Sequence, residues 1–267
     1  MTPARAALPH LSACIITFNE ADRIADCLRS LAFVDDIVVI DSGSTDGTAA
    51  IAEAMGARVL VRAFDGFRSQ KAFAVEQARH DWVLCLDADE RVSDALRDEI
   101  AVVRATGFAG AAGYVFPRMS WYFGRFLRHG TDYPDRVLRL FDRRCGGWRG
   151  EREIHESASV DGNVVRLRGD LLHYPFRSLL QMLDKLQGYA AMMAEHDMAR
   201  GKRASLLKLL LAPGWRFFRS YVLKRGFLDG MPGLLAAWVH ANYVRQKAMM
   251  LWLLQHGQPV RTPRRPG

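Results

Sequence analysis

Two aspartates, Asp87 and Asp89, follow the apolar run 82–86 with one residue between them. The run is too short for a helix and is bounded by polar residues, which is typical of a buried strand. Two carboxylates at the end of such a strand can hold a hard divalent cation through oxygen and leave coordination positions open for diphosphate oxygens. The same pair in an ordinary turn would simply be solvated. The strand before it therefore favours the metal-binding interpretation.

A third acid, Asp41, ends the apolar run 36–40. An acid in this place can accept hydrogen bonds from the ribose or base of a nucleotide. In dinucleotide-binding folds a GxGxxG loop would follow the first strand, but residues 17–20 contain no glycine, and no GxxxxGK motif occurs in the chain. The sequence thus argues against nicotinamide, flavin and P-loop enzymes. Asp46 is explained more simply as a residue that starts or caps the next helix.

The elements that must position these acids alternate along the first hundred residues. Short apolar runs predict strands at 11–17, 36–40, 58–62 and 82–86, and apolar residues at helical spacing predict helices at 21–31, 45–55, 69–79 and 93–105. Strand and helix repeated in this way indicate right-handed βαβ units and a parallel sheet covered on both faces. Because ligands of such doubly wound sheets bind outside the carboxyl ends of the strands, we expect the acids to lie at that edge.

The remainder of the chain has a different pattern. Residues 114–117, 136–141 and 164–172 predict further strands, and from residue 178 onward the sequence predicts helices at 178–198, 206–223 and 232–255, the second broken at Pro213-Gly214. We therefore expect a catalytic domain at 1–177, a helical region at 178–258 and a disordered tail at 259–267. Arg136 and Arg139 could face phosphates of an anionic acceptor or be solvated.

The composition is that of a globular protein, with 267 residues of which 49% are hydrophobic and 25% charged. These values exclude a disordered, collagen-like or disulfide-stapled chain. The four cysteines form no CxxC pair, and Cys14 and Cys85 lie inside predicted strands. We expect them to be small core residues of a protein in a reducing compartment.

The net charge of +8 is distributed unevenly, because residues 200–267 contain 13 lysines and arginines against the single acid Asp229. A basic segment of this kind suggests membrane phospholipid or nucleic acid as a partner. The basic residues alternate with Leu, Trp, Phe and Met, which is typical of helices at a membrane interface. The apolar stripes could equally pack on the α/β core. No secretory signal is recognisable, and the apolar stretches 230–244 and 248–260 are too short to span a bilayer.

Three segments together resemble the family-2 glycosyltransferases of GT-A fold. They are residues 15–20 (IITFNE), 39–48 (VIDSGSTDGT) and 86–90 (LDADE). Further elements resemble the lipopolysaccharide-core β-1,4-glucosyltransferase branch, namely His155-Glu156, residues 171–174 (LLHY) and Leu228-Asp229-Gly230. The resemblance extends to about residue 255. It implies a GT-A-like, doubly wound, mainly parallel sheet with a C-terminal helical extension.

The resemblance also implies a UDP-sugar donor, inversion at the anomeric carbon, and roles for individual residues. The donor-binding set is Thr17, Asn19, Glu20, Asp41, Ser42, Lys71 and Asp87, and the set for Mg²⁺ or Mn²⁺ is Asp87, Asp89 and His173. Lys71 could also be a solvated residue on a helix, and His173 could be structural.

Inverting transfer needs a carboxylate base for the acceptor hydroxyl. Glu156, beside His155, is the first candidate, and Glu151 and Glu153 are its competitors. In an extended segment Glu151 and Glu153 would lie on one face and Glu156 on the other, so the three cannot share the role.

The resemblance thus implies a metal-dependent hexosyltransferase that moves a hexose, with glucose as the first choice, from a UDP-sugar to a lipid-linked saccharide acceptor, with the lipopolysaccharide inner core as the first choice. We expect it to be cytoplasmic and peripheral on the inner membrane, held by its basic helices, with no nucleic-acid partner. A sugar-nucleotide nucleotidyltransferase is an alternative, although its glycine-rich loop is missing after the first strand. A second alternative is a catalytically dead α/β protein that binds membrane or nucleic acid. The presence of both Asp87 and Asp89 argues against it.

Overall fold

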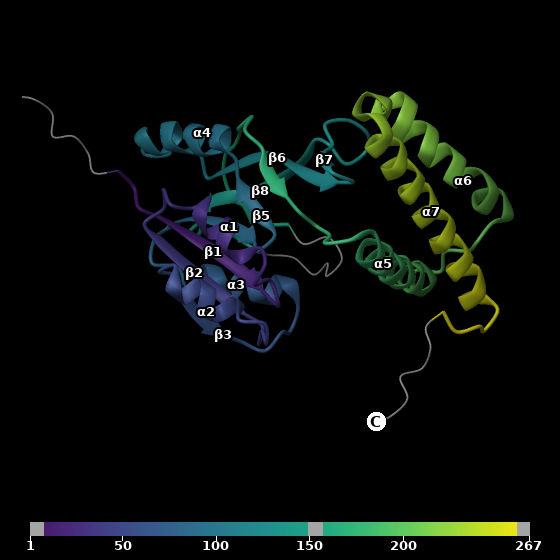
Figure 1. The fold of residues 1–267 in the computed structure, drawn as a ribbon, viewed down its shortest axis with the longest axis horizontal. Helices are drawn as coiled ribbons and strands as arrows, with labels where there is room; N and C mark the ends of the chain where they lie inside the picture. The colour runs from purple at the N-terminus through teal and green to yellow at the C-terminus, as the bar shows by residue number, and fades with distance from the viewer. Residues whose placement is uncertain (1–7, 149–156, 261–267) are drawn as a thin grey trace, which may run out of the picture. The chain divides into compact units, whose positions relative to one another are not determined.

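A computed structural model describes residues 8–148 and 157–260 (Figure 1). Its described parts form two compact units, one within Met1–Met119 and Asp135–His173 and the other within Ser120–Pro134 and Tyr174–Gly267. The predicted division into domains after residue 177 stays a prediction.

The first unit alternates strands and helices along most of its length. In chain order it contains β1 (Leu11–Thr17), α1 (Ile24–Arg29), β2 (Asp36–Asp41), α2 (Thr48–Ala54), β3 (Arg58–Val61), α3 (Phe67–Glu76), β4 (Trp82–Asp87), β5 (Glu90–Val92), α4 (Asp94–Ala105), the first part of β6 (Gly113–Tyr122), β8 (Asp135–Asp142), β9 (Gly146–Gly147), β10 (Ser159–Val160), β11 (Val164–Arg166) and β12 (Leu171–His173).

The main sheet has the order β3-β2-β1-β4-β8-β6-β12-β5. The first four strands of this order are parallel, whereas β8 pairs antiparallel with both β4 and β6. The chain steps outward from β1 through β2 to β3 and then returns to the other side of β1 with β4. The switch point of the strand order therefore lies between β1 and β4. The predicted α/β class with a mostly parallel sheet is confirmed.

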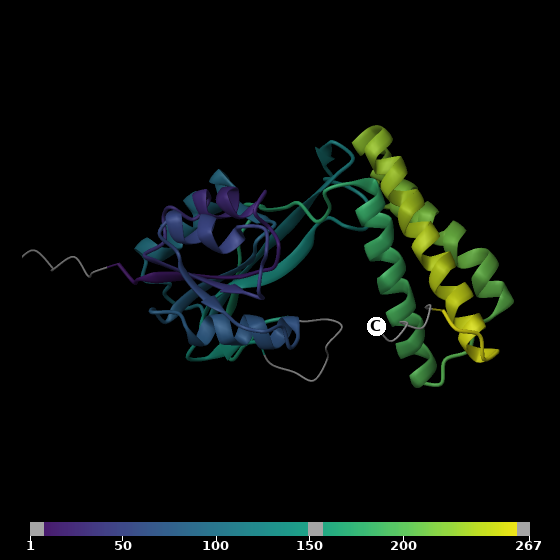
Figure 2. The same cartoon turned by 60° about the horizontal axis from the view of Figure 1, so that its bottom comes forward.

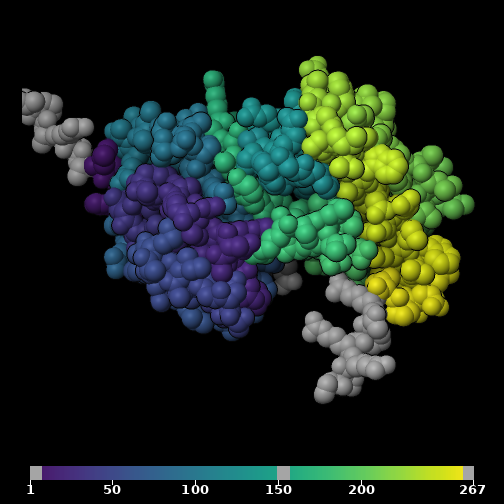
Figure 3. All heavy atoms as spheres, viewed as in Figure 1, coloured from purple at the N-terminus to yellow at the C-terminus, as the bar shows by residue number. Residues whose placement is uncertain are grey.

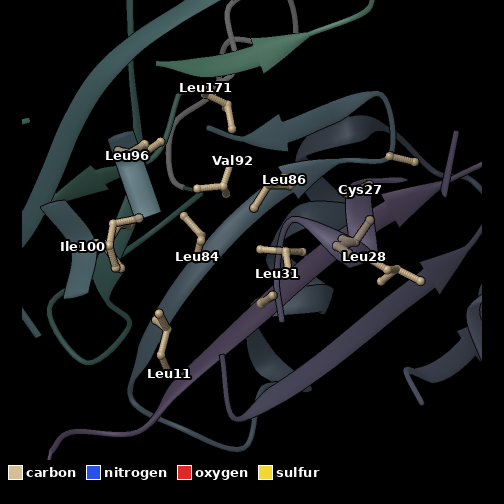
Figure 4. Close-up of a cluster of buried hydrophobic side chains, with 14 of the residues drawn as sticks. Leu11, Cys27, Leu28, Leu31, Leu84, Leu86, Val92, Leu96, Ile100 and Leu171 are labelled. Carbon is tan, nitrogen blue, oxygen red and sulfur yellow. The ribbon is translucent and has the colours of Figure 1, made fainter. Parts of the chain in front are cut away.

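Apolar side chains of the central strands point alternately to the two faces of this sheet, and helices cover both faces. Leu84 and Leu86 of β4 belong to a buried cluster with Leu96 and Ile100 of α4, which also includes residues of α1 and α2 (Figure 4). Their neighbours on β4, including Cys85, belong to a second cluster with residues of α3. Successive strand residues point to opposite faces, so one run of apolar residues fills two cores. This explains why the polar residues of the central strands β1, β2 and β4 lie at or next to the strand ends, while the interiors are apolar.

The second unit consists of β7 (Arg125–Phe126), α5 (Leu179–Ala199), α6 (Leu206–Phe218), a π-helical turn (Arg219–Leu223), a 3₁₀ turn (Gly226–Asp229) and α7 (Gly230–Gln255). In both views α7 runs between α5 and α6 and packs against each of them (Figures 1 and 2). Among the described residues no helix is both long and apolar enough to cross a membrane.

A buried carboxylate ties the loop after β7 to the start of α7. Asp229 is 1% exposed and accepts hydrogen bonds from the backbone N–H groups of Arg128 and His129, at 3.0 and 2.8 Å, and lies 3.1 Å from Nδ1 of His129. Burying a carboxylate is costly unless it is paired or hydrogen-bonded, and these contacts meet that condition. The segment 120–134 therefore belongs with the C-terminal helices.

One expected break in a helix is wrong. The helix α6 continues through Pro213, although proline removes one backbone hydrogen bond at a cost of about 3 kcal/mol in a helix interior. The fixed backbone angle of proline is itself helical, and α6 packs along α7, so tertiary contacts offset the lost bond. The irregularity falls later, at the π-helical turn that begins at Arg219.

In the first unit a buried acid at the start of β2, Asp36, joins neighbouring parts of the sheet. Its carboxylate accepts hydrogen bonds from Nε of Arg58 at 2.9 Å, from Oγ of Ser12 at 2.9 Å and from the backbone N–H of Arg79 at 3.1 Å. Burial alone would raise the pKa of Asp36, but these hydrogen bonds outweigh it and lower the pKa below its usual value. The ionised carboxylate thus stabilises the fold.

We predict that Asp36→Asn lowers the free energy of unfolding at pH 7 by about 2–4 kcal/mol. Because the pKa is lowered in the folded state, this stabilisation is present above about pH 4 and is lost as the pH falls through the folded-state pKa. Urea denaturation of both proteins across this pH range measures the difference. It should shrink in acid, while the exposed Asp98→Asn should leave stability nearly unchanged. A difference that stays constant down to pH 2 would contradict the assignment.

Candidate active site

The carboxyl ends of three adjacent strands bring the predicted acids together. In the parallel register Thr17 lies opposite Asp41, and Ile16 lies opposite Asp87. The positions therefore meet at the switch point of the sheet, where ligands of open α/β sheets bind. Thr17 and Asp41 are buried, and the Asp87 side chain is 25% exposed.

The loops after β1 and β2 are joined by hydrogen bonds that involve Asn19. Its side-chain oxygen accepts from the N–H of Thr45 at 2.9 Å, and its own N–H donates to Oγ of Ser44 at 2.8 Å. Asn19 has a positive φ of 53°, which asparagine tolerates better than most residues. The N–H of Glu20 likewise donates to Oγ1 of Thr48 at 2.9 Å. Asn19 and Glu20, which the resemblance assigns to donor binding, are thus held where the loop after β1 meets the loop after β2.

The acid at the end of β2 organises its own loop. One carboxylate oxygen of Asp41 accepts hydrogen bonds from the N–H groups of Gly43, at 3.2 Å, and Ser44, at 2.8 Å, and the other accepts from the Ser44 hydroxyl. Gly43 has a φ of +89°, which favours glycine. The hydroxyl of Ser42 accepts from Nε2 of Gln70 on α3 at 3.0 Å. These contacts hold the loop in place beside the strand end.

Asp87 is held by two cations from different elements. Nζ of Lys71, on α3, lies 3.0 Å from one carboxylate oxygen, and Nη2 of Arg139, on β8, lies 2.8 Å from the other. Burial alone would raise the pKa of Asp87, but the charges and hydrogen bonds of Lys71 and Arg139 lower it far below its usual range. Asp87 is therefore an ionised carboxylate at every physiological pH. Lys71 lies at the candidate site and is not a solvated helix residue.

A fully buried acid, Glu90, connects this pair to the rest of the sheet. Its carboxylate accepts from the N–H of Asp87 at 2.9 Å and lies 3.1 Å from Nη1 of Arg118 and 3.2 Å from Nη2 of Arg139. Sequence reasoning missed this role. The position of Glu90 directly after Asp87-Ala88-Asp89 could have indicated a role at the site. Its partners Arg118 and Arg139 lie 28 and 49 residues further along the chain, so local patterns do not pair them with it.

An aromatic ring completes the basic side of the site. Nζ of Lys71 lies 4.8 Å from the ring centroid of Trp148, and the guanidinium carbon of Arg139 lies 5.3 Å from it. Both are within the range of cation–π attraction. Arg139 is buried, whereas Arg136 is exposed, so the two arginines of β8 have different surroundings.

Asp89 and His173 form the second half of the site. Nε2 of His173, at the end of β12, lies 3.7 Å from a carboxylate oxygen of Asp89, and Nη1 of Arg23 lies 4.0 Å from the same oxygen. Burial, together with the neighbouring carboxylates of Asp87 and Glu90, raises the pKa of Asp89 to about 7. Burial lowers the pKa of His173 to about 4, so its imidazole is neutral at pH 7.

A carboxylate with a raised pKa beside a neutral imidazole is a donor set that suits a divalent cation. Asp89 and His173 fit such a cation, whereas the oxygens of Asp87 already have cationic partners. Within the described part of the chain no group of three or more His, Cys, Asp or Glu side chains is gathered around a metal position. Further ligands would have to come from a bound diphosphate or from water.

The candidate bases Glu151, Glu153 and Glu156 lie outside the described residues, as does His155. Their assignment stays a prediction.

The fold and the site together define a class of protein. Acids, a lysine and an arginine at the switch point of an α/β sheet are suited to bind a nucleotide diphosphate. Residues 12–155 match the model of the family described as Glycosyl transferase family 2. The chain belongs to this family.

Curated relatives extend over most of the chain. It is 31% identical over 250 residues to a lipopolysaccharide core biosynthesis glycosyltransferase, LpsC, of Rhizobium meliloti, which covers 89% of this chain and 92% of the relative. It is also 31% identical over 247 residues to a glycosyltransferase of Rickettsia felis, with 86% of this chain and 85% of the relative covered.

Solved structures match more distantly. S. aureus TarS in complex with UDP-GlcNAc aligns with a TM-score of 0.45 and 14% identity over 94% of this chain and 93% of that chain. A glucosyl-3-phosphoglycerate synthase of Mycobacterium tuberculosis, in complex with Mn²⁺, UDP and glucosyl-3-phosphoglycerate, aligns with a TM-score of 0.34 and 24% identity over 43% of this chain and 45% of that chain.

We predict that Glu90→Gln destabilises the protein by about 3–5 kcal/mol, because it leaves the buried Arg139 with Asp87 as its remaining charged partner. Chemical denaturation measures the loss. The exposed Glu53→Gln on α2 is the matched control and should change stability by less than about 0.5 kcal/mol. Equal stability of Glu90→Gln and Glu53→Gln would show that Glu90 does not hold the network.

Proposed function

We propose that the protein is an inverting hexosyltransferase that moves glucose from UDP-glucose to a lipid-linked saccharide of the lipopolysaccharide inner core. One observation carries the proposal: the ends of β1, β2 and β4 gather Thr17, Asp41 and Asp87 at the switch point of a family-2 glycosyltransferase domain. The similarity to a lipopolysaccharide core glycosyltransferase over most of the chain supports the acceptor class.

In this proposal the donor lies across the ends of the three strands. Thr17, Asn19 and Glu20 line the nucleotide pocket, and Asp41 with Ser42 accepts hydrogen bonds from uracil or ribose. Lys71 and Arg139 both carry positive charge beside Asp87, so they also stand where a diphosphate would be attracted.

The donor set of Asp89 and His173 supports a role for Mg²⁺ or Mn²⁺, with Asp87 as a further candidate ligand. Asp87 could coordinate directly only if its ion pairs with Lys71 and Arg139 rearranged. When bound, a divalent ion would offset the negative charge that develops on the departing UDP.

The acceptor hydroxyl must lose a proton as its oxygen bonds to the anomeric carbon and the bond from that carbon to the diphosphate breaks. We assign the proton to a carboxylate of the segment 151–156, with Glu156 first and Glu151 and Glu153 as competitors. A single direct displacement of this kind inverts the anomeric centre.

A lipid-linked acceptor requires the enzyme to work at a membrane. From Arg200 to Val260 the one acid is the buried Asp229, so the exposed charges of this segment are positive. This supports a peripheral position on the cytoplasmic face of a bacterial inner membrane, reached through the C-terminal helices.

The experiment is UDP release from UDP-glucose, UDP-galactose and UDP-N-acetylglucosamine in the presence of Mn²⁺ and a truncated-core lipopolysaccharide acceptor. We expect release that requires the acceptor and is fastest with UDP-glucose. A faster reaction with another sugar would correct the donor, and no release with any of the three would contradict the proposed reaction.

We predict that Asp89→Ala lowers the rate of acceptor-dependent UDP release by about a hundredfold or more, because it removes the carboxylate proposed to hold the cation. The exposed Asp98→Ala is the control and should retain the rate of the unchanged protein. Activity of Asp89→Ala near that of Asp98→Ala would exclude Asp89 from the site.

We predict that Glu156→Gln binds UDP as the unchanged protein does but loses transfer by about a hundredfold or more, since the amide cannot take up the proton. Equilibrium binding and UDP release, measured on the same preparations, separate the two effects. Glu151→Gln and Glu153→Gln should keep transfer. If one of these two loses it and Glu156→Gln does not, the base is that residue.

A further inference from the structure

The outward face of α6 is apolar. Leucines and aromatic residues recur on it at helical spacing and are strongly exposed: Leu206 72%, Leu207 66%, Leu210 66%, Leu211 61%, Trp215 59% and Phe218 44%. A helix on the surface of a globular protein normally shows polar residues to solvent and turns its apolar stripe inward. Here the inward side packs against α7, and the solvent side is apolar as well.

The neighbouring surface of α7 continues this character. Met231 is 64% exposed and Trp238 is 66% exposed, and the ring of Trp238 lies 6.3 Å from that of Phe217 on α6. Figure 3 shows α6 and α7, coloured green to yellow, as a continuous outer surface of the second unit. A monomeric soluble protein rarely exposes a contiguous apolar surface of this kind, and such surfaces mark contact sites.

The charges around this surface select its occupant. Lys208 on α6 and Arg219 in the π-helical turn are exposed, and the exposed Lys224 and Arg225 come directly after that turn. Two copies of the chain joined through the same face would bring these cations together, which is unfavourable. Nucleic acid would match the charge but would leave the leucines and Trp215 without an apolar contact. An anionic lipid surface matches both the cations and the apolar stripe.

We propose that α6 lies in the plane of an anionic bilayer surface, with Leu207, Leu211 and Trp215 in the boundary between headgroups and acyl chains. Lys208 and Arg219 then contact lipid phosphates, and long basic side chains can reach outward while their stems stay on apolar surface. The inference rests on the proposed function in one respect: the lipid-linked acceptor is the reason why the enzyme would work at a membrane. The contact itself needs neither donor nor acceptor.

The test is co-sedimentation of the full chain with vesicles of phosphatidylcholine mixed with phosphatidylglycerol, and with vesicles of phosphatidylcholine alone. We expect binding to the anionic vesicles that weakens with added salt, and weak binding to the neutral ones. Leu207→Ser/Leu211→Ser should bind the anionic vesicles at least about tenfold more weakly, because two apolar side chains lose their burial.

The matched control is Val61→Ser/Val102→Ser, which removes two similarly exposed apolar side chains of the first unit, 73% and 66% exposed, and should bind as the unchanged protein does. Unchanged vesicle binding by a folded Leu207→Ser/Leu211→Ser protein would overturn the proposal. The proposal would also be overturned if the unchanged protein formed dimers that dissociate in this variant, because the face would then belong to a second copy. Retention on polynucleotide without binding to vesicles would overturn it as well. If the protein binds anionic vesicles but releases no UDP, the proposed reaction alone is contradicted and the membrane contact is not.

Discussion

The ion-paired network around Asp87 is the constraint on which the first unit depends. Asp87 and Glu90 bring two negative charges into the interior next to a central strand, and Lys71, Arg118 and Arg139 compensate them from three other elements. Removing one member would leave an uncompensated buried charge, which is far more costly than a lost surface ion pair. The positions of α3, β6 and β8 relative to β4 are therefore fixed by charge as well as by apolar packing.

The same network separates the roles of the two aspartates. Asp87 has its cations built into the protein, whereas burial and the surrounding carboxylates make ionisation of Asp89 unfavourable. In the proposed reaction this imbalance would favour a cation near Asp89 and an anionic diphosphate near Lys71 and Arg139. The charges and the fold both support the proposal that a nucleotide-sugar donor binds at the end of β4.

Much of this arrangement could be predicted from the sequence, because it follows from local patterns. β1 begins and ends where its apolar run does, and β2, β3 and β4 differ from the predicted runs by one residue. Strand ends then place Asp41 and Asp87 at one edge. The partners of Glu90 could not be predicted in this way. Arg118 and Arg139 arrive on β6 and β8, which join the sheet by antiparallel pairing over long sequence separations, and single-sequence patterns contain no register for such pairs. The continuation of α6 through Pro213 depends likewise on packing against α7.

Calorimetric titration of the purified protein with UDP, with and without Mn²⁺, tests the central claim most directly. The account predicts UDP binding that Mn²⁺ strengthens, and predicts that Asp89→Ala removes this strengthening. A folded protein that binds no UDP in either condition would contradict the assignment of the strand ends as a UDP-sugar site.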